Sequence, residues 1–331
     1  MGLTRASTAA ASTADIPLSA AADTGYSAAE PLRVRVPATS ANVGVGFDCL
    51  GLALTLYAEF VFAPSADGQL HITGCEERFR GADNLVWTSY RHACEELDVP
   101  TQLLSIEIDS PIPLAGGLGS SSACIVAGIA AAFALAGLPL DRDRMLRLAT
   151  TLEGHPDNVA PAIYGGLTCS FTDNGDVTTL HYDVADSLSF VTIVPPYEVR
   201  TAQARRVLPG DVPLSVVPWQ TGRAVAMVTA LTSGDAALIR KCAHDRIHEP
   251  YRAKLIPDYE AFRSAALACG ASAYLISGSG ATTLAICPSD TVANRVIRRI
   301  AGMESVAEAE GYRRGIVVHN LHASATGVTL V

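Results

Sequence analysis

The stretch Pro111–Ala123 reads PIPLAGGLGSSSA, with three glycines followed by three consecutive serines. The run before it, Leu103–Ile108, alternates apolar and polar residues and predicts a strand. The run after it, Cys124–Ala136, is small, apolar and uncharged, and predicts a buried helix. The sequence therefore predicts a strand, a glycine loop and a buried helix in succession.

The glycines of this loop favour an anion-binding site. Gly116, Gly117 and Gly119 have no Cβ, so their backbone N–H groups can converge on one point. The helix behind them adds unpaired N–H groups and the positive end of its dipole. A nucleotide phosphate fits such a site, although a tight turn without a ligand is the alternative. The serines Ser120–Ser122 favour the phosphate, because one hydroxyl can ligate Mg²⁺ while others cap the helix.

Two well-known phosphate motifs do not match the loop. A Walker loop ends in Gly-Lys-Ser/Thr, and this stretch has no lysine, so metal, dipole and amides must meet the phosphate charge. A dinucleotide fingerprint needs an acidic residue at the end of a second strand. Asp141 stands at about the right distance, but it follows Gly137-Leu-Pro and predicts a helix cap instead.

Length, composition and charge restrict the class of protein. The 331 residues are 49% hydrophobic and 17% charged, which predicts two packed domains. The net charge of −9 gives no electrostatic attraction for nucleic acid or anionic lipid, so we expect a small-molecule partner and neither of those two. No uninterrupted apolar run reaches the roughly 18 residues of a membrane span.

The cysteines and the N-terminal residues suggest a cytoplasmic location. Eight cysteines occur without any Cys-x-x-Cys pair, which predicts reduced thiols rather than a zinc site or a disulfide framework. Residues 1–30 are rich in Ala, Ser and Thr and lack an apolar signal core. They contain three acidic residues and only one arginine, unlike a transit peptide, so we expect a disordered tail.

A polar loop follows the first predicted strand, Leu32–Pro37. The loop, residues 38–48, reads ATSANVGVGFD and is small enough to approach a ligand closely. The alternative is a turn in which Asn42 and Asp48 only cap backbone groups. A second cluster, Glu153, His155, Asp157 and Asn158, stands where one predicted helix ends and another begins. Capping would explain one of these residues, but four together indicate a site.

The second half of the chain adds arginines and a glycine turn. Arg205 and Arg252 could lean into a cleft between domains, where two guanidinium groups would suit a carboxylate. The turn Gly278–Gly280 predicts a hairpin, either a plain one or one that reaches the neighbouring domain's loop. His244 and His248 have the i, i+4 spacing of two metal ligands, but the rest of the metalloprotease motif is missing. We therefore expect both histidines at the surface of a helix spanning Asp235–His248.

Three motifs together resemble the GHMP kinases, the group named for galactokinase, homoserine kinase, mevalonate kinase and phosphomevalonate kinase. PIPLAGGLGSSSA resembles their central phosphate loop, PATSANVGVGFDCLGLAL (residues 37–54) their first motif, and LISGSGATTLAI (residues 275–286) their third. They occur in the family's order and cover nearly the whole chain after residue 31.

Four details resemble the homoserine kinase branch in particular. They are the first motif from Ser40 to Asp48, His155-Pro-Asp-Asn158 continuing to Pro161, Thr201–Arg205 and Glu249–Arg252. This branch transfers the γ-phosphate of ATP to the side-chain hydroxyl of L-homoserine, on the route to threonine. The alternatives are a mevalonate-type or sugar-type kinase, or a non-catalytic nucleotide or amino-acid sensor on the same fold. No lysine precedes Lys241, which is unlike the mevalonate-type members.

The resemblance implies an α+β, two-domain GHMP kinase fold. Residues 31–185 would form the N-terminal ATP-binding domain, a mixed β-sheet with helices and the phosphate-binding glycine loop. Residues 186–331 would form a C-terminal ferredoxin-like α/β sandwich. The active site would lie in the cleft between them and use ATP and Mg²⁺. A homodimer is one option for the assembly.

The resemblance also implies roles for individual residues. Asn42, Asp48 and His155 would hold the amino acid, and Arg205 and Arg252 would clamp its carboxylate. Catalysis would rest on Asp157, as base or as support, and on Asn158, which can orient the hydroxyl but takes no proton. Ser121, or a neighbouring serine, and Glu153 would bind Mg²⁺. The nucleotide would contact Asn84, Pro113, Leu114, Ala115, Gly116, Gly117, Leu118, Gly119, Ser120, Ser121 and Ser122.

Overall fold

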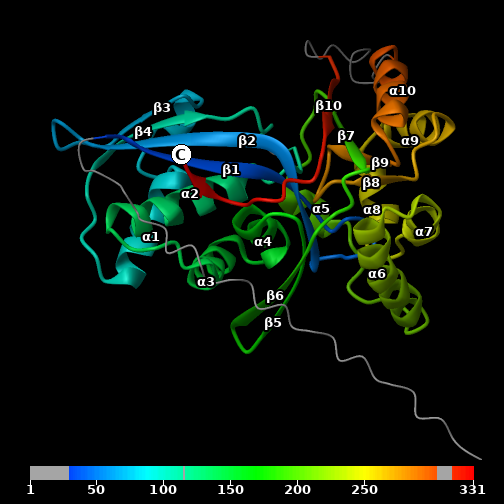
Figure 1. Ribbon diagram of the computed structural model, residues 1–331, viewed down its shortest axis with the longest axis horizontal. Coiled ribbons are helices and arrows are strands. Elements are labelled where there is room, and N and C mark those ends of the chain that lie inside the picture. The colour runs from blue at the N-terminus through cyan, green and yellow to red at the C-terminus, as the bar shows by residue number, and fades with distance from the viewer. Residues whose placement is uncertain (1–29, 115, 304–314) are drawn as a thin grey trace, which may run out of the picture.

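The computed structural model describes residues 30–114, 116–303 and 315–331 (Figure 1). The expected N-terminal tail, except residue 30, and Ala115 of the glycine loop lie outside the described residues. The described chain forms two β-sheets, each covered by helices. The α+β fold with two sheet units, expected from the sequence, is thereby confirmed.

The first sheet has seven strands in the order β11-β1-β2-β4-β3, with β5 paired to β2 and β6 to β5. It is mixed, because β3 runs parallel to β4 while the other pairs are antiparallel. Its strands are β1 (Leu32–Ala41), β2 (Leu50–Pro64), β3 (His71–Thr73), β4 (Leu104–Asp109), β5 (Leu167–Asp173), β6 (Asp176–Tyr182) and β11 (Thr329–Leu330).

Four helices pack below this sheet in Figure 1: α1 (Leu85–Leu97), α2 (Ser120–Leu135), α3 (Arg142–Glu153) and α4 (Pro156–Tyr164). The central helix α2 is buried on nearly all sides, as its uncharged sequence predicts. Its small residues let α1 approach closely. A Cβ on Gly128 would lie 2.3 Å from the carbonyl oxygen of Val86 in α1. The packing of α2 fixes the direction of its N-terminus, where the glycine loop ends.

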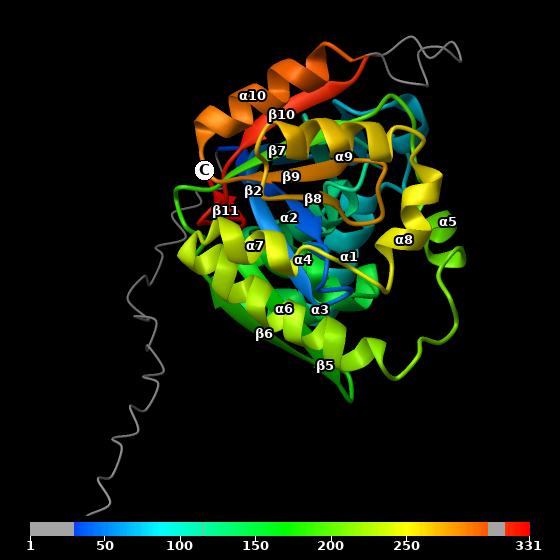
Figure 2. The ribbon, with the colours of Figure 1, turned by 90° about the vertical axis from the view of Figure 1, so that its right-hand side faces the viewer.

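The second sheet has four antiparallel strands in the order β10-β7-β9-β8. Figure 2 shows these strands as one layer of the second unit. Alternate residues of β9 belong to different cores. Leu284 and Ile286 join the large core that also contains residues of the first sheet, whereas Ala285 and Cys287 join a smaller core. The strands are β7 (Ser189–Val194), β8 (Ala273–Ile276), β9 (Thr283–Cys287) and β10 (Val317–Leu321).

The helices of this unit divide between the two cores. Residues of α6 (Val216–Ser233) and α7 (Ala236–Cys242) belong to the large core. Residues of α9 (Tyr259–Ala268) and α10 (Asp290–Ala301) belong to the smaller one. The remaining short helices are α5 (Thr201–Arg206), α8 (Glu249–Arg252) and two 3₁₀ turns, η1 (Glu77–Phe79) and η2 (Ala253–Leu255). One large core therefore connects both sheets.

Two details differ from the sequence expectation. The predicted helix Asp235–His248 is wrong, because α7 ends at Cys242 and a new helix starts at Glu249. At the break, the Asp245 carboxylate accepts the N–H groups of Ile247, His248 and Glu249, and such local side-chain bonds to the backbone compete with a continuing helix. The last strand, β11, returns to pair with β1. The domain limits 31–185 and 186–331 stay predictions, and strand pairing at the C-terminus crosses them.

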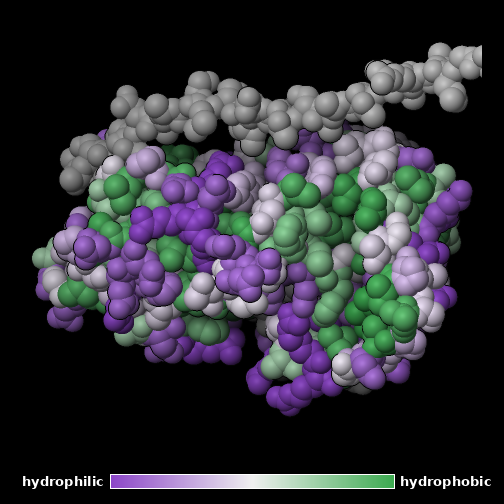
Figure 3. All heavy atoms as spheres, turned by 90° about the horizontal axis from the view of Figure 1, so that it is seen from below, coloured by the Kyte–Doolittle hydropathy of each residue, from purple (hydrophilic) through white to green (hydrophobic). Residues whose placement is uncertain are grey.

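The surface differs between the two units. Seen from below Figure 1, polar residues dominate the left side, and apolar residues gather on the right, the side of α6 (Figure 3). Val217 and Val225 of α6 are exposed. Within the described ranges, no helix combines the length and apolar character that crossing a membrane would require.

Candidate active site

The glycine loop leaves the sheet after β4 and ends at the start of α2. Gly117 and Gly119 have positive φ angles of 79° and 72°. Side chains at these positions would also collide with neighbours, because a Cβ on Gly119 would lie 2.0 Å from Thr39 Oγ1. Gly119 precedes α2 and has no side chain to cap the first amides, which lack intrahelical partners. Those amides and the helix dipole suit an anion.

Both sheet units hold the loop in place through its carbonyl oxygens. The backbone N–H of Thr39 donates to Leu118 over 3.1 Å. From the second unit, Ser277 Oγ donates to the Gly117 carbonyl over 2.7 Å, and the Thr282 N–H donates to the Gly116 carbonyl over 3.1 Å. Of the two interpretations of the turn Gly278–Gly280, the one in which it reaches the neighbouring loops is confirmed by these bonds and by Gly278 N–H to Ala41 O (3.2 Å).

An oxygen cluster lies at the N-terminus of α2. Ser121 Oγ and Ser122 Oγ donate to the same oxygen, Oε1 of Glu153, over 2.9 and 3.0 Å. Gly154 ends α3 with φ 89°, which turns the chain directly after Glu153. Carboxylate and hydroxyl oxygens are the donors that Mg²⁺ prefers, and Mg²⁺ usually adds phosphates and water to one or two carboxylates. The donor set therefore fits Mg²⁺ held together with a nucleotide.

His155 and Asp157 form a close pair at the start of α4. His155 Nδ1 lies 2.5 Å from Asp157 Oδ1, and the Asp157 side chain is almost wholly buried. This hydrogen bond, against the effect of burial, raises the pKa of the His155 imidazole above its ordinary value. Pro156, the first residue of α4, fits there because that position needs no N–H partner.

Asn158 follows on the same helix and contacts the first strand. Thr39 Oγ1 donates to Asn158 Oδ1 over 2.8 Å. Thr39 also meets the glycine loop through its backbone N–H, so it links the loop with Asn158. The sequence reasoning missed Thr39, although it stands in the first motif beside residues that were singled out.

Asp48 of the first unit and Arg205 of the second form an ion pair that joins the two units. The two terminal guanidinium nitrogens of Arg205, Nη1 and Nη2, donate to Oδ2 and Oδ1 of Asp48, each over 3.0 Å. The pair is about one third to two fifths exposed. Asn42, which is buried, accepts the Asp48 N–H over 3.0 Å and donates to the Gly278 carbonyl over 2.9 Å. The predicted substrate residues of the first motif therefore face the second unit.

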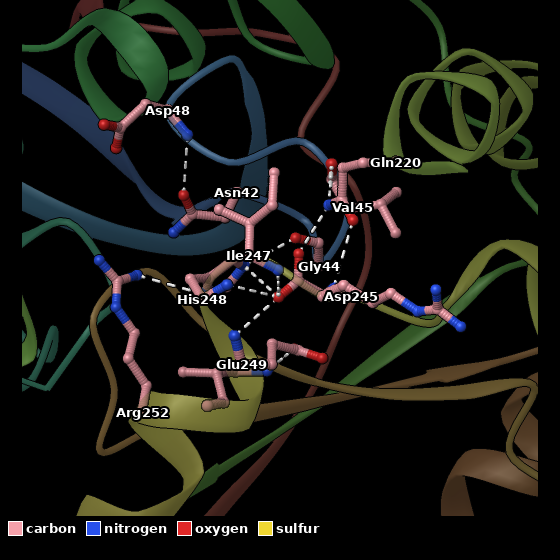
Figure 4. Close-up of polar contacts among 12 residues, drawn as sticks. Asn42, Gly44, Val45, Asp48, Gln220, Asp245, Ile247, His248, Glu249 and Arg252 are labelled. Atoms are coloured by element: carbon pink, nitrogen blue, oxygen red, sulfur yellow. Dashed lines mark hydrogen bonds and ion pairs between the residues drawn. The ribbon is translucent and has the colours of Figure 1, made fainter. Parts of the chain in front are cut away.

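Arg252 is buried, and Figure 4 shows its guanidinium group beside His248. It donates to the Gly278 carbonyl over 2.9 Å, the same oxygen that Asn42 contacts. The Phe47 ring lies 5.3 Å from the Arg252 guanidinium carbon and 6.0 Å from that of Arg205. Burial is the main cause that lowers the pKa of the Arg252 guanidinium. The positive charge of Arg205 lowers it further, whereas the negative charge of Asp48 raises it. The two predicted arginines therefore lie beside the same aromatic ring, that of Phe47.

The remaining nucleotide residues are placed at the edges of the site. Asn84 is buried and caps α1, accepting the Val86 N–H (2.9 Å) and donating to the Phe79 carbonyl (2.7 Å). Its predicted contact with the nucleoside stays a prediction. Leu114 is exposed and Pro113 is half-buried. Together with the loop glycines and serines they border the N-terminus of α2.

The expectation that His244 and His248 both lie at the surface is half wrong. His244 is exposed, but His248 is fully buried. The reason is the break after α7, which turns His248 toward the first motif, where its ring lies 2.7 Å from the Gly44 carbonyl. Asp245 and Gln220 join the same network and were also missed. The signal in the sequence was Asp245, a residue type whose side chain competes with a helix for backbone N–H groups.

Comparisons with known proteins agree with this geometry. Residues 84–166 match the family model described as GHMP kinases N terminal domain, and residues 227–303 match GHMP kinases C terminal. A homoserine kinase of Clostridium botulinum is 38% identical over 253 residues, 76% of this chain and 85% of that protein. A homoserine kinase of Synechococcus is 42% identical over 264 residues, 78% of this chain and 86% of that protein.

Solved structures extend the likeness to the whole fold. A crystal structure of homoserine kinase from Cytophaga hutchinsonii has a TM-score of 0.80 and 31% identity, covering 91% of this chain and 97% of that one. The expected two-domain architecture is the one found in this group. The chain belongs to the GHMP kinase family, and within it to the homoserine kinases.

Proposed function

We propose that this protein transfers the γ-phosphate of ATP to the side-chain hydroxyl of L-homoserine, giving O-phospho-L-homoserine on the route to threonine. The observation that carries the proposal is the bidentate pair of Arg205 and Asp48 beside the buried Arg252. The names of its relatives, homoserine kinases at 38% and 42% identity, support the same substrate.

The paired charges match those of a free amino acid. A substrate ammonium group binds Asp48, and a substrate carboxylate binds the guanidinium groups of Arg205 and Arg252, whose planar fork suits two oxygens. Without substrate, Arg205 and Asp48 neutralise each other. A zwitterion therefore replaces one internal ion pair by two external ones, so neither charge is left unpaired in the cleft.

The phosphate half of the site uses few side-chain charges. The amides of the glycine loop and the dipole of α2 hold the triphosphate. Ser121 and Glu153 hold Mg²⁺, with Ser122 as the alternative hydroxyl. Bound Mg²⁺ would supply positive charge that offsets the negative charge of the phosphates.

The acceptor hydroxyl meets the start of α4. Phosphoryl transfer has a loose transition state, so positioning outweighs a strong base. Asn158, oriented by Thr39, donates a hydrogen bond that orients the substrate hydroxyl. Asp157 supports His155, because its hydrogen bond raises the pKa of the imidazole and so favours the cationic form, which would stabilise negative charge in the site. The alternative role of Asp157 is that of a base.

Two rival functions use the same fold. A mevalonate-type kinase would bind a carboxylate without an ammonium group, which leaves Asp48 without a purpose, and a sugar kinase needs neither arginine. A non-catalytic sensor would bind ATP without transferring phosphate. The intact set of Ser121, Glu153 and His155–Asp157 argues against a sensor.

Release of ADP from Mg·ATP in the presence of homoserine, threonine, mevalonate or galactose tests the proposal. We expect turnover with homoserine and little with the other three. Turnover with mevalonate or galactose alone would show that homoserine is not the substrate. ATP binding without ADP release in the presence of any of these alcohols would favour the non-catalytic sensor. A cytoplasmic location and a homodimer stay predictions, to be checked by cell fractionation and by light scattering of the purified protein.

A further inference from the structure

The buried ring of His248 lies between the two units and uses both of its nitrogens (Figure 4). Nε2 lies 2.7 Å from the carbonyl oxygen of Gly44, in the first motif. Nδ1 lies 3.4 Å from Nη1 of Arg252. A carbonyl oxygen can only accept and a guanidinium can only donate, so Nε2 carries the proton and Nδ1 accepts. The contacts therefore require one tautomer of the neutral imidazole.

The surroundings fix the orientation of this ring. Phe47 stacks on it with the ring centres 5.3 Å apart. Asp245 Oδ2 accepts the backbone N–H of His248 over 2.7 Å, and Asp245 Oδ1 accepts from the Gln220 amide over 2.6 Å. The same amide nitrogen donates to the Val45 carbonyl over 2.8 Å. Asp245 and Gln220 thus attach the segment of His248 to the loop that carries Gly44.

We propose that His248 is a positioning residue for the amino-acid half of the site, setting the distance between the first motif and the Arg252 guanidinium. Arg252 and Asn42 meet at one oxygen, the Gly278 carbonyl, and Asn42 in turn holds Asp48. His248 contacts the same guanidinium nitrogen of Arg252, Nη1, that donates to Gly278. This inference rests on the proposed function, since it assigns these groups to one zwitterionic substrate.

The charge state of His248 supports the assignment. Burial, the main cause, lowers the pKa of its imidazole, and Arg252 lowers it further, while Asp245, the bond to Gly44 and Asp48 act in the other direction. Protonation would place an N–H on Nδ1, directly facing Arg252, and a second positive charge beside it. The hydrogen bond to Arg252 would then be lost, so homoserine binding should weaken as the pH falls through the pKa of His248.

Kinetics of three variants test the proposal. In His248→Leu we expect the KM for homoserine to rise at least tenfold, while the KM for ATP and kcat change less than threefold. His248→Gln keeps a donor for Gly44 and an oxygen acceptor, so it should recover most of the loss. It should also lack the rise in KM at acidic pH, because an amide does not titrate there. His244→Gln, the same change at an exposed histidine, is the control and should leave all three constants unchanged.

A spectroscopic measurement is independent of the substrate. In the ¹⁵N-histidine spectrum of the intact protein, the signal that disappears in His248→Gln should be that of a neutral ring protonated at Nε2. A charged ring or an Nδ1–H tautomer at neutral pH would overturn the proposal, as would parallel losses in the KM for ATP and in kcat in both His248 variants. If His248→Leu does not fold, the Gln variant and this spectrum decide. Failure of homoserine as a substrate would refute the proposed function and leave the tautomer result intact.

Discussion

The two halves of the site are built in opposite ways. The phosphate half is one continuous stretch, in which glycine amides and small residues lie at the start of α2 and the main charge nearby is Glu153. The amino-acid half is assembled from charged side chains far apart in the sequence, and 157 positions separate Asp48 from Arg205. The first half suits a ligand shared by many kinases, whereas the second can change its substrate by changing side chains.

The two halves also tolerate change differently. Backbone amides keep their positions as long as the fold does, and α2 is embedded in the large core. The charges of the amino-acid half depend on contacts between the two units, through Gly278, Arg252 and the first motif. Substitutions in the two halves should therefore separate into effects on ATP and effects on homoserine.

The largest effect should come from Glu153→Ala. Glu153 accepts from both Ser121 and Ser122 and is the carboxylate offered to Mg²⁺. We expect kcat/KM to fall by about 10²–10³, the cost typical of removing one preorganised electrostatic group. Mg²⁺ titration of the activity should also shift to higher concentration. Of Ser121→Ala and Ser122→Ala, the variant whose activity needs more Mg²⁺ identifies the ligating hydroxyl. If the Mg²⁺ dependence of Glu153→Ala is unchanged, Glu153 does not bind the metal.

Arg205→Ala should affect the other half alone. Loss of a charged hydrogen bond of about 1.5–3 kcal/mol raises the KM for homoserine about 10- to 150-fold. The KM for ATP should stay within twofold. Arg206→Ala, at the exposed neighbour, is the matched control. Equal changes in both KM values would show that the two halves are not separable at this residue.

Gly119→Ala should disturb the phosphate half by about tenfold. The added Cβ would lie 2.0 Å from Thr39 Oγ1, and φ 72° is strained for alanine by about 1–2 kcal/mol. We expect a higher KM for ATP and a lower melting temperature. Gly137→Ala, also at positive φ (69°) but with no atom within 4 Å of the added Cβ, separates the collision from the backbone strain. Equal KM values for ATP in the two variants would contradict the close fit of the loop.

Glu249→Gln should have the smallest effect on turnover, below threefold, and appear in stability instead. Burial raises the pKa of Glu249 to about 8, while its oxygen accepts the Ile276 N–H, a bond that glutamine can keep. Between about pH 4.5 and 8 the native state holds a proton that the unfolded state has released. The stability of the wild type therefore falls as the pH rises through this window.

Glu249→Gln should lack this fall of the unfolding free energy with rising pH. Urea unfolding at several pH values measures it, and the difference between the two proteins should grow with pH to the order of a few kcal/mol. Parallel pH profiles for wild type and Glu249→Gln would show that Glu249 is charged in the folded protein and has a partner that neutralises it.

The sequence predicted the strand, the glycine loop and the helix of the phosphate half because their signals are local. Glycines, serines and the following apolar run stand side by side, and Asn84 and Asp141 cap helices where the pattern places them. The amino-acid residues were found through the family resemblance, since nothing local indicates that Arg205 meets Asp48. His248 was misplaced because i, i+4 spacing assumes a continuous helix. The helix ends at Cys242, and Asp245 holds the backbone N–H groups of the turn that follows. Only the tertiary structure shows what this turned segment contacts.

Substrates shortened by one charged group test the division between the halves most directly. 4-Hydroxybutyrate lacks the ammonium group of homoserine and 3-aminopropan-1-ol lacks the carboxylate, while both keep the reacting hydroxyl. With saturating Mg·ATP, we expect kcat/KM for each to be at least a hundredfold below that for homoserine, and Arg205→Ala to reduce turnover of the hydroxy acid but not of the amino alcohol. Comparable turnover of homoserine and either shortened substrate would contradict the assignment of Asp48, Arg205 and Arg252 to a zwitterion.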